Sequence, residues 1–277
     1  MKPVASKFST TPFRFESYGV KIIVEGNQQK LIGDAEVRAR TALLGNLRKI
    51  RSASFDHHFQ VLTKRGTGWK LIHNDNDFGW SWSKKNFLNF FDAILRVSVG
   101  ELAVDRVFLH SGAVGWKGKA ILLPANSFKG KSTLVSELVR QGADYYSDEF
   151  AVLDTKGLLH PYSRPISMRS DDGKYTTFEL TVEELEGSYG KKPIPVGTVL
   201  LTEHIPGRPW RAPRQVSAGA AMLAMIPFSL AIRTRPDMTM SVLRQISENS
   251  MVLMGKRGDA KKYAERLLRL VDGLSLS

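Results

Sequence analysis

In the first hundred residues, several segments have the hydrophobic pattern that is typical of β-strands, and a later segment has the pattern that is typical of an α-helix. Residues 13–24 are rich in β-branched and aromatic side chains and run into the turn-forming segment 25–27, so they predict extended structure. Residues 57–64 and 68–73 have the same character and flank Arg65-Gly66-Thr67, which predicts a β-hairpin. Strands separated by short polar turns therefore dominate this part of the chain.

A helix is predicted after these strands, because apolar side chains recur at intervals of three and four residues. The residues that form this stripe are Phe87, Phe90, Phe91, Ile94 and Leu95. A stripe at this spacing is one face of an amphipathic helix, and such a face usually packs into a core. We therefore interpret the stripe as a core face and not as a surface on which a cofactor stacks.

From residue 106 onward, short apolar runs bounded by glycine alternate with helical patterns. Strands are predicted at 107–109, 112–116, 119–123, 143–147, 150–153 and 196–202, and helices at 131–141, 217–226, 237–249 and 258–272. Alternating strands and helices are typical of an α/β fold. We therefore predict a smaller α+β accessory region over residues 1–105 and an α/β domain over residues 106–277.

Composition narrows the class of protein. Of the 277 residues, 42% are hydrophobic and 24% charged, which excludes a disordered or collagen-like chain. The absence of cysteine excludes disulfides, zinc sites built on thiolates and cysteine nucleophiles. Residues 1–11 lack the apolar core of a signal peptide, and the longest apolar stretch, 218–232, is interrupted by Pro227. We therefore expect a cytoplasmic protein that does not enter a membrane.

Positive charge predominates, with 40 lysines and arginines against 27 acidic residues and a net charge of +13. Residues 1–105 carry 16 − 10 = +6 and residues 106–277 carry 24 − 17 = +7, so the charge is spread over the chain. Such a surface attracts anions, which include nucleotides, acidic peptides and nucleic acids. The sequence has no helix-turn-helix pattern and no interleaved basic and aromatic motif, so we expect no nucleic acid partner.

One segment carries a specific chemical pattern. The apolar run Ile121-Leu122-Leu123 leads through a loop to Gly130-Lys131-Ser132-Thr133, which opens a helix. This is the phosphate-binding loop pattern G-x-x-x-x-G-K-[ST], except that Ala125 replaces the first glycine. Loop amides and the helix N-terminus bind phosphate oxygens in this pattern, the lysine reaches the outer phosphates, and the serine binds Mg²⁺. The residues expected to bind a nucleotide are Asn126, Ser127, Phe128, Lys129, Gly130, Lys131, Ser132 and Thr133.

Two further features lie at predicted strand ends. Asp148-Glu149 follows the strand at 143–147, 17 and 18 residues after Lys131. Ligands of α/β sheets gather at the C-terminal edge of parallel strands, where such a pair can hold Mg²⁺ and accept a substrate proton. His110 ends another apolar strand, 21 residues before Lys131. A lone Asp-Glu pair is usually a solvated turn and a lone histidine is usually structural. Position relative to the phosphate-binding loop favours function for the acidic pair.

Taken together, these elements resemble the kinase domain of the HPr kinase/phosphorylase family. The matching segments are His110-Ser111-Gly112, Ile121-Leu122-Leu123, Gly130-Lys131-Ser132-Thr133, Arg140-Gln141-Gly142 and Ser147-Asp148-Glu149. The resemblance covers residues 106–170 and keeps the spacing from the histidine to the lysine and from the lysine to the acidic pair. The whole chain looks like the divergent HPr-kinase-like proteins, because residues 1–105 do not resemble the regulatory domain of a bona fide HPr kinase.

The resemblance implies a P-loop kinase domain that transfers the γ-phosphate of ATP, with Mg²⁺, to a serine hydroxyl. Lys131 looks like the phosphate-binding lysine of the family, Ser132 like its magnesium-binding serine and His110 like its active-site histidine. Asp148 stands at the first acidic position, which we expect to serve the metal, and Glu149 at the second, the proton acceptor. Some members of the divergent group modify peptides, so the expected acceptor is a hydroxyl of a peptide, a protein or a small molecule.

Three features depart from that family. Glu149 replaces an aspartate and is one methylene longer, which leaves its division of roles with Asp148 open. In the family, a glycine-rich stretch with a magnesium-binding glutamate is tied to the reverse, phosphorylase reaction. Residues 170–177 contain no clean counterpart of this stretch, so we do not expect the reverse reaction. Ala125 requires a negative φ or free space for its Cβ. It is the best argument for the alternative, a catalytically degenerate module that binds or senses a nucleotide, whereas the retained lysine, serine and carboxylates favour the kinase.

Downstream arginines can stabilise the phosphoryl group during transfer. Among them we favour Arg164 and Arg169, which lie close after the acidic pair in the sequence. The oligomeric state, the nucleotide preference and the identity of the phosphate acceptor stay open, and a homo-oligomer is compatible with all of these observations.

Overall fold

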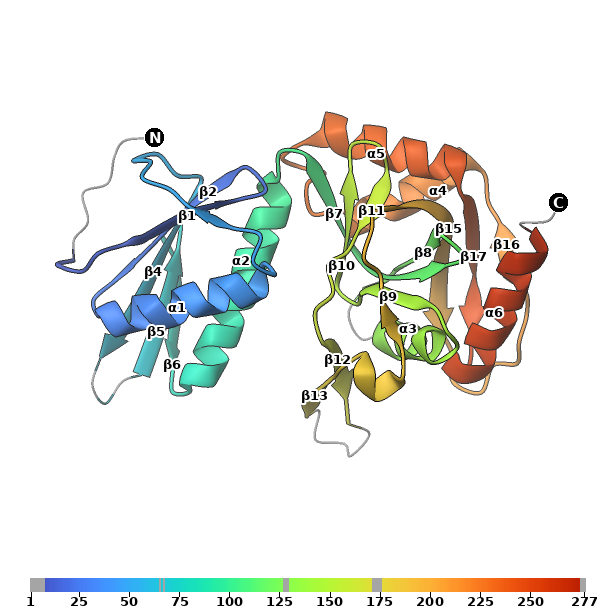
Figure 1. Ribbon diagram of the computed structural model, residues 1–277, viewed down its shortest axis with the longest axis horizontal. Coiled ribbons are helices and arrows are strands. Elements are labelled where there is room, and N and C mark those ends of the chain that lie inside the picture. Colours follow the sequence, from blue (N-terminus) through green and yellow to red (C-terminus); the bar gives the residue numbers. More distant parts are fainter. Residues whose placement is uncertain (1–7, 65, 67, 127–129, 171–175, 275–277) are drawn as a thin grey trace. The chain divides into compact units, whose positions relative to one another are not determined.

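The structure of the protein, a computed structural model, describes residues 8–64, 66, 68–126, 130–170 and 176–274. The chain divides into two compact units, Met1–Asp105 and Arg106–Ser277. This division falls at the residues where the sequence changes in character. Helices and several β-sheets build the chain, as Figure 1 shows, so it belongs to the mixed α/β class.

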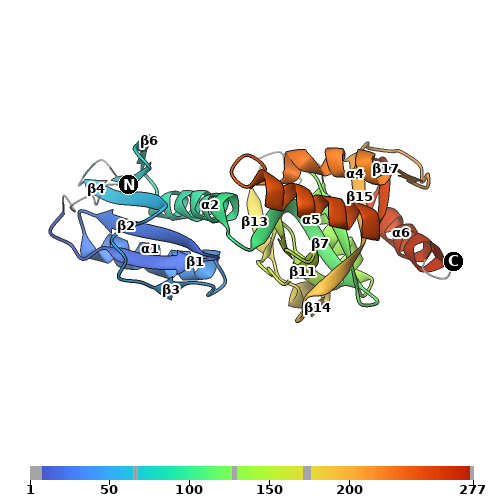
Figure 2. The ribbon, with the colours of Figure 1, turned by 90° about the horizontal axis from the view of Figure 1, so that it is seen from above.

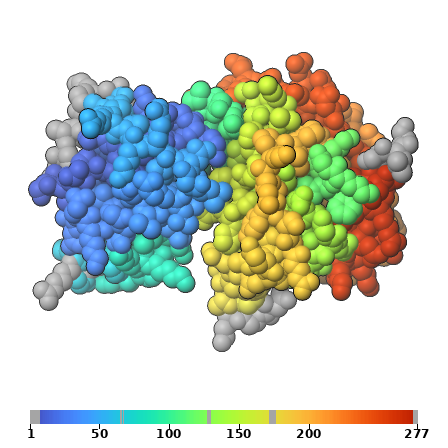
Figure 3. Space-filling view, in the orientation of Figure 1, coloured from blue at the N-terminus to red at the C-terminus, as the bar shows by residue number. Residues whose placement is uncertain are grey.

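The first unit consists of a six-stranded sheet and two helices. Its strands lie in the order β3-β1-β2-β4-β5-β6. Their bounds are β1 Phe13–Ser17, β2 Val20–Gly26, β3 Arg48–Lys49, β4 His57–Lys64, β5 Gly68–His73 and β6 Asn76–Ser81. The helices are α1 Gln29–Ala42 and α2 Lys84–Leu102. Both pack against the sheet in one core, and α1 forms much of the surface that this unit shows in Figure 3.

The strand predictions for this unit are confirmed in part. Strands β4 and β5 pair antiparallel, as the predicted hairpin requires. The extended segment at 13–24 is interrupted, because Tyr18 and Gly19 have φ values of 49° and 77° and turn the chain between β1 and β2. Helix α1 has no counterpart among the predicted elements. The pattern of apolar residues therefore predicts the strands of this unit more completely than its helices.

The apolar stripe of α2 faces the core over most of its length. Phe87, Phe91 and Leu95 are buried in the same cluster as the sheet residues. Phe90 differs, because it is 40% exposed and its ring packs edge-on against Phe78 of β6, with the ring centroids 5.0 Å apart. The prediction of a core face is wrong for Phe90, since β6 is the last strand of the sheet and no strand beyond it covers this side chain.

The second unit is built on a nine-stranded mixed sheet. Its strands lie in the order β14-β9-β7-β10-β11-β15-β17-β16, and β8 pairs with both β7 and β15. The bounds are β7 Arg106–Trp116, β8 Lys119–Pro124, β9 Asp144–Ser147, β10 Phe150–Asp154, β11 Leu158–His160, β14 Ser188–Tyr189, β15 Ile194–His204, β16 Arg214–Gln215 and β17 Met251–Arg257. A separate hairpin consists of β12 Ile166–Arg169 and β13 Thr177–Leu180.

Helices cover both faces of this sheet, as Figures 1 and 2 show. They are α3 Lys131–Arg140, α4 Ala218–Met225, α5 Pro236–Asn249 and α6 Ala260–Leu274, with short 3₁₀ turns at Glu183–Leu185 and Ile226–Phe228. Along β8, Ile121 and Leu123 pack with α3 and α6, whereas Ala120 and Leu122 pack with α4 and α5. Side chains that alternate across a strand thus bury both of its faces. No helix among the described residues is long and apolar enough to span a lipid bilayer.

Strands β8, β9, β15 and β17 run in the same direction, although the sheet is mixed. Strands β8 and β9 are both antiparallel to β7, β15 is parallel to β8, and β17 is parallel to β15. The C-terminal ends of β8, β9, β15 and β17 therefore point to one edge of the sheet. Loops that follow these strands gather at that edge, which is the edge where ligands of α/β sheets usually bind.

Two histidines of the first unit share a partly buried hydrogen bond. Nδ1 of His57 lies 3.0 Å from Nε2 of His73, and Nε2 of His57 lies 3.1 Å from the carbonyl oxygen of Ser98. Since a carbonyl oxygen only accepts, Nε2 of His57 carries the proton and Nδ1 is the acceptor. Burial lowers the pKa of both rings, and the neighbouring histidines help to lower that of His73 to about 4.

Acid should therefore destabilise the first unit. The unfolded chain binds protons first as the pH falls, because an unperturbed histidine has a pKa of about 6.5. Stability is fully present above about pH 6.5 and is lost as the pH falls toward 4, the pKa of His73. The loss is on the order of 1 kcal/mol, since solvent screens the partly exposed ring of His73.

The His73→Phe variant isolates this effect. It keeps an aromatic ring stacked on Phe59, as His73 is in the structure, and removes the titrating nitrogen. Thermal unfolding followed by circular dichroism should show a smaller fall in Tm between pH 7 and pH 5 for this variant than for the wild type. An equal fall in both proteins would show that the histidine pair does not carry the pH dependence.

Candidate functional site

The segment between β8 and α3 lies at the sheet edge where the four strands end. Strand β8 ends at Pro124 and α3 begins at Lys131, so the predicted order of strand, loop and helix is confirmed. Gly130 is the N-cap of α3 and has a φ of 72°, a left-handed conformation that glycine adopts without strain. Ala125 is not among the described non-glycine residues with positive φ, so its backbone meets the condition that a Cβ imposes.

The predicted nucleotide-binding residues are only partly described. Those outside the described residues are Ser127, Phe128 and Lys129. Asn126 is exposed just before this gap, and Thr133 is exposed on the first turn of α3, so both are accessible to a ligand. Lys131 and Ser132 are half-buried, and each contacts another predicted site residue.

Strand register explains which segments meet at this edge. Ser111 of β7 lies opposite Pro124, the last residue of β8. Ala113 of β7 lies opposite Ser147, the last residue of β9. The middle of β7 is therefore flanked by the ends of two strands. His110, the predicted phosphate-binding loop and the acidic pair come from these three consecutive strands, which pair with one another in the sheet.

Helix α3 approaches β7 very closely at Gly112. A Cβ built at this position would lie 2.5 Å from Cγ2 of Val135 and 3.2 Å from Cγ of Lys131. Real Cβ atoms do not come so close to a packed side chain, so only glycine permits this arrangement. The close approach brings the first turn of α3 beside His110, which precedes Gly112 by two residues on the same strand.

His110 and Lys131 form a hydrogen bond, with 3.1 Å between Nε2 and Nζ. An ammonium group only donates, so Nε2 of His110 accepts and its Nδ1 carries the ring proton. Burial lowers the pKa of His110 to about 4, assisted by the charge of Lys131, and the ring is therefore neutral at pH 7. Burial also lowers the pKa of Lys131, but the nearby Asp148 and Glu149 oppose this effect.

A second hydrogen bond joins Ser132 to Asp148. Oγ of Ser132 donates to Oδ2 of Asp148 over 2.8 Å. Asp148 is 8% exposed, and its Oδ1 is buried without a hydrogen-bond partner among the described residues. Burial raises the pKa of Asp148 to about 7, although Lys131 and Ser132 act in the opposite direction. A buried carboxylate with an unmatched oxygen beside a hydroxyl fits a hard divalent cation, which takes oxygen ligands.

Glu149 occupies the turn between β9 and β10. Its carbonyl oxygen accepts a hydrogen bond of 3.1 Å from the N–H of Ser111, and its own N–H donates to Oγ of Ser147 over 3.3 Å. The backbone of this residue is thus fixed to β7 and β9. The side chain is half-buried, and its negative charge raises the pKa of both His110 and Lys131, so it belongs to the same electrostatic cluster.

Arg257 also reaches this site, although no motif in the sequence marks it as a site residue. It ends β17, is 3% exposed, and donates through Nη2 to the carbonyl oxygen of Gly130 over 2.5 Å. A Cβ on Gly130 would lie 2.7 Å from that nitrogen. The available signal is the apolar run Val252-Leu253-Met254 between two helical patterns, because such a run predicts a buried strand whose end carries this arginine.

Arg164 and Arg169, the two arginines predicted to stabilise the phosphoryl group, lie at the β12–β13 hairpin. Arg169 is exposed at the end of β12. Arg164 is half-buried, and its carbonyl oxygen accepts a hydrogen bond of 2.6 Å from the hydroxyl of Tyr145. Strand β12 packs against α3, where Oγ of Ser136 lies 3.8 Å from the sulfur of Met168. Arg164 therefore lies just before the strand that packs against α3, and Arg169 is the last residue of that strand.

The polar groups of the site are suited to a divalent cation that binds together with a phosphorylated ligand. Among the described residues, no group of three histidine or acidic side chains could hold a metal ion by itself. Ser132 and Asp148 can contribute two oxygen ligands, and Mg²⁺ in nucleotide sites usually takes one or two protein ligands together with phosphate oxygens and water. The arrangement therefore fits Mg²⁺ bound to a phosphorylated ligand better than Mg²⁺ bound alone.

Comparison with known proteins assigns no family. No protein-family model and no curated protein matches this chain. The chemistry of the site is therefore read from its own geometry, in which a lysine is held by a neutral histidine and a serine by a buried carboxylate. Together with the left-handed glycine before α3, these groups can bind phosphate oxygens, a divalent cation and a transferred proton.

Asp148 should destabilise the protein when no ligand is bound. Its pKa in the folded state, about 7, lies above the ordinary value of 3.8, so protonation favours the folded state. Stability is therefore lost as the pH rises from about 4 to about 7. Asp148→Asn removes the charge and keeps an oxygen that can accept from Ser132.

Scanning calorimetry measures the consequence. At pH 8, the Tm of Asp148→Asn should exceed that of the wild type by about 2 °C or more, and the difference should shrink as the pH falls toward 4. An unchanged or lower Tm at pH 8 would show that the buried carboxylate does not carry the energetic cost that its surroundings indicate.

Proposed function

We propose that the second unit is an ATP-dependent kinase that transfers a phosphoryl group to a hydroxyl. The proposal is carried by two hydrogen bonds, Lys131–His110 and Ser132–Asp148, which link the first turn of α3 to the middle of β7 and to the turn after β9. The resemblance to HPr-kinase-like proteins assigns roles to these same four residues. A buried strand, a loop and a helix in this order support the finer proposal of a P-loop kinase domain.

The site offers the groups that a nucleoside triphosphate requires. The first turn of α3 has backbone N–H groups without partners inside the helix, and these attract phosphate oxygens. Two cations, the half-buried Lys131 and the buried Arg257, lie beside the loop. Charges interact more strongly in such a poorly solvated position than at the surface. Phosphates bound here would meet positive charge from helix α3 and from the end of strand β17.

Glu149 is the proposed proton acceptor. The acceptor oxygen forms a bond to the γ-phosphorus while the bond from that phosphorus to the bridging oxygen of ADP breaks, and the hydroxyl proton moves to the Glu149 carboxylate. Asp148 is less suited to this role, because one of its oxygens already accepts from Ser132. Mg²⁺, when bound with the phosphates by Ser132 and Asp148, would neutralise negative charge on the leaving ADP.

His110 is proposed as a positioning residue. Its neutral ring accepts a hydrogen bond from Lys131 and adds no positive charge beside the ammonium group. The side chain of Lys131 is thereby directed while its remaining protons stay available to phosphate oxygens. A protonated histidine at this position would instead repel the lysine, which is consistent with the lowered pKa of the ring.

The alternative is a module that binds a nucleotide without transferring phosphate. Its main argument is Ala125, and that residue is not among those described with positive φ, so the alanine brings no backbone strain. The most direct test of transfer is incubation with isotope-labelled ATP, Mg²⁺ and the serine-containing peptides and metabolites of a cell extract. Mass spectrometry then identifies the product, and a specific labelled serine would support the kinase.

Lys131→Ala should weaken the binding of ATP–Mg²⁺ by at least about tenfold, since a charge-assisted contact contributes roughly 1.5–3 kcal/mol. Isothermal titration calorimetry measures this change. The matched control is Lys119→Ala, which removes a lysine from the other end of β8 and should leave the affinity unchanged. Equal affinities of Lys131→Ala and the wild type would exclude a phosphate-binding role for the loop.

Glu149→Gln should abolish transfer while the affinity for ATP–Mg²⁺ stays near that of the wild type, because the amide cannot accept the proton. Asp148→Asn should lower the rate and also raise the Mg²⁺ concentration needed for half-maximal rate. Titrations of Mg²⁺ against rate distinguish the two variants. If Asp148→Asn loses transfer with unchanged Mg²⁺ dependence and Glu149→Gln stays active, the two roles are exchanged, and if both stay active the site is not catalytic.

A further inference from the structure

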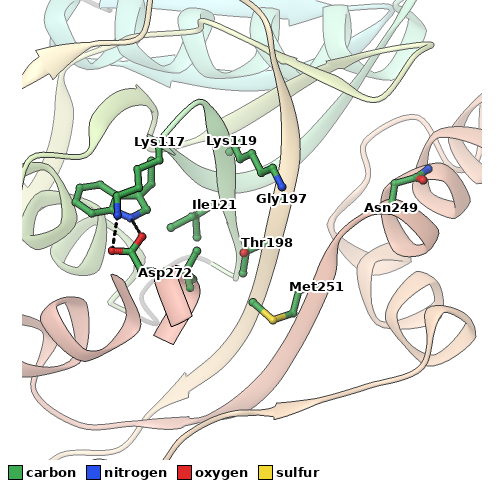
Figure 4. A pocket seen from close by; sticks show the side chains of 11 residues that line it. Lys117, Lys119, Ile121, Gly197, Thr198, Asn249, Met251 and Asp272 are labelled. Carbon is green, nitrogen blue, oxygen red and sulfur yellow. Dashed lines mark hydrogen bonds and ion pairs between the residues drawn. The ribbon is translucent and has the colours of Figure 1, made fainter. Parts of the chain in front are cut away.

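A cavity of about 320 Å³, whose lining residues Figure 4 shows, lies at the sheet edge opposite the candidate kinase site. It opens near the N-terminal ends of β8, β15 and β17, whereas the phosphate-binding loop follows the C-terminal end of β8. The six residues of β8 span roughly 15–20 Å, which separates the two sites. The cavity is at the small end of the volumes typical of small-molecule sites, about 300–1,000 Å³.

The cavity is associated with an irregularity in β15. The register of β15 with β8 shifts between Val196 and Thr198, which makes Gly197 the extra residue of a β-bulge. A Cβ on Gly197 would lie 2.8 Å from Cβ of Lys119, so the glycine lets this lysine cross β15. Glycines in bulges commonly mark places where a ligand or another chain segment comes close to a strand.

Two polar groups at the cavity are available to a ligand. Lys119 is exposed and has no ion pair among the described residues. Thr198 is 2% exposed, and its hydroxyl has no hydrogen-bond partner in the described part of the chain. Figure 4 shows Lys119 extending to Gly197, next to Thr198. An ammonium group and a hydroxyl so placed can both donate to one anionic group.

The second lysine of the cavity is already neutralised. Nζ of Lys117 lies 2.8 Å from Oδ2 of Asp272, and the indole N–H of Trp116 donates to Oδ1 of the same carboxylate over 2.9 Å. These contacts hold the end of α6 to the β7–β8 turn and satisfy both oxygens of Asp272. The cavity therefore presents a single unmatched positive charge, that of Lys119.

Apolar side chains line the remainder of the cavity. Ile121 and Met251 line it from β8 and β17, and Figure 4 shows both next to Thr198. Val271 of α6 contributes a further apolar side chain. A ligand of complementary chemistry has one negative charge at one end and a short hydrocarbon part at the other, because each part then meets a matching surface.

We propose that this cavity binds a small carboxylate with a short apolar chain. The carboxylate accepts from Lys119 and Thr198, and the chain lies over Ile121 and Met251. A nucleotide or a phosphate dianion fits less well, since one lysine cannot balance several negative charges beside an apolar wall. This inference does not rest on the proposed kinase activity, because the two sites share no residue.

Three probes test the two halves of the proposal separately. Hexanoate carries both the carboxylate and the chain, acetate carries the carboxylate alone, and hexan-1-ol carries the chain without charge. At constant ionic strength, hexanoate should bind saturably with a stoichiometry of one, and each of the other probes should bind at least about tenfold more weakly. Calorimetry gives the affinities, and the indole N–H resonance of Trp116, assigned with Trp116→Phe, reports the location.

Variants of the polar groups complete the test. Lys119→Gln and the isosteric Thr198→Val should each weaken hexanoate binding, the first by about tenfold, and leave hexan-1-ol unaffected. The matched control is Lys262→Gln, which makes the same charge change near the start of α6. The cavity is lined by the end of that helix, so this variant should bind hexanoate like the wild type. Non-saturable binding, equal affinities for hexanoate and hexan-1-ol, or unchanged binding by Lys119→Gln would overturn the proposal.

Discussion

The candidate site depends on the contact between helix α3 and strand β7 at Gly112. With any larger residue at this position, α3 would have to move away, since a Cβ would come within 2.5 Å of Val135. The contact fixes the first turn of α3 against the middle of β7, where His110 meets Lys131. Backbone pairing of β7 with β8 and β9 then adds the loop and the acidic pair to the same place. One missing side chain thus sets the geometry of several functional groups.

The same packing makes the site energetically costly in the free protein. Burial raises the pKa of Asp148 to about 7 and lowers that of His110 to about 4, so both groups resist the charges that they carry readily in water. Lys131 and Asp148 compensate each other only in part, because Oδ1 of Asp148 lacks a hydrogen-bond partner among the described residues. Perturbed groups of this kind cluster at functional sites, where ligands supply the missing partners.

In the second unit, the two ends of the same parallel strands border two sites with different binding properties. The parallel strands β8, β15 and β17 end where Lys131 and Arg257 meet the loop, and they begin near the cavity that holds Lys119. At the first edge helix α3 begins, and the N-terminus of a helix favours the binding of phosphates. At the second edge a turn, a bulge and the end of α6 surround an apolar space with one free charge. The fold therefore gives opposite ends of one strand different binding properties.

Local features of the fold follow from the amino-acid sequence alone. The apolar runs and glycines predict β8, α3 and β9, and the spacing of Lys131, Ser132 and Asp148 along these elements predicts that they belong to one site. Sequence could not show that Phe90 faces solvent, that Arg257 reaches Gly130, or that Gly197 opens a bulge beside Lys119. Each of these depends on which strands are neighbours and on how closely helices approach them. Periodicity is a property of one segment, whereas burial, register and pKa arise from segments that are distant in sequence and meet only in the folded chain.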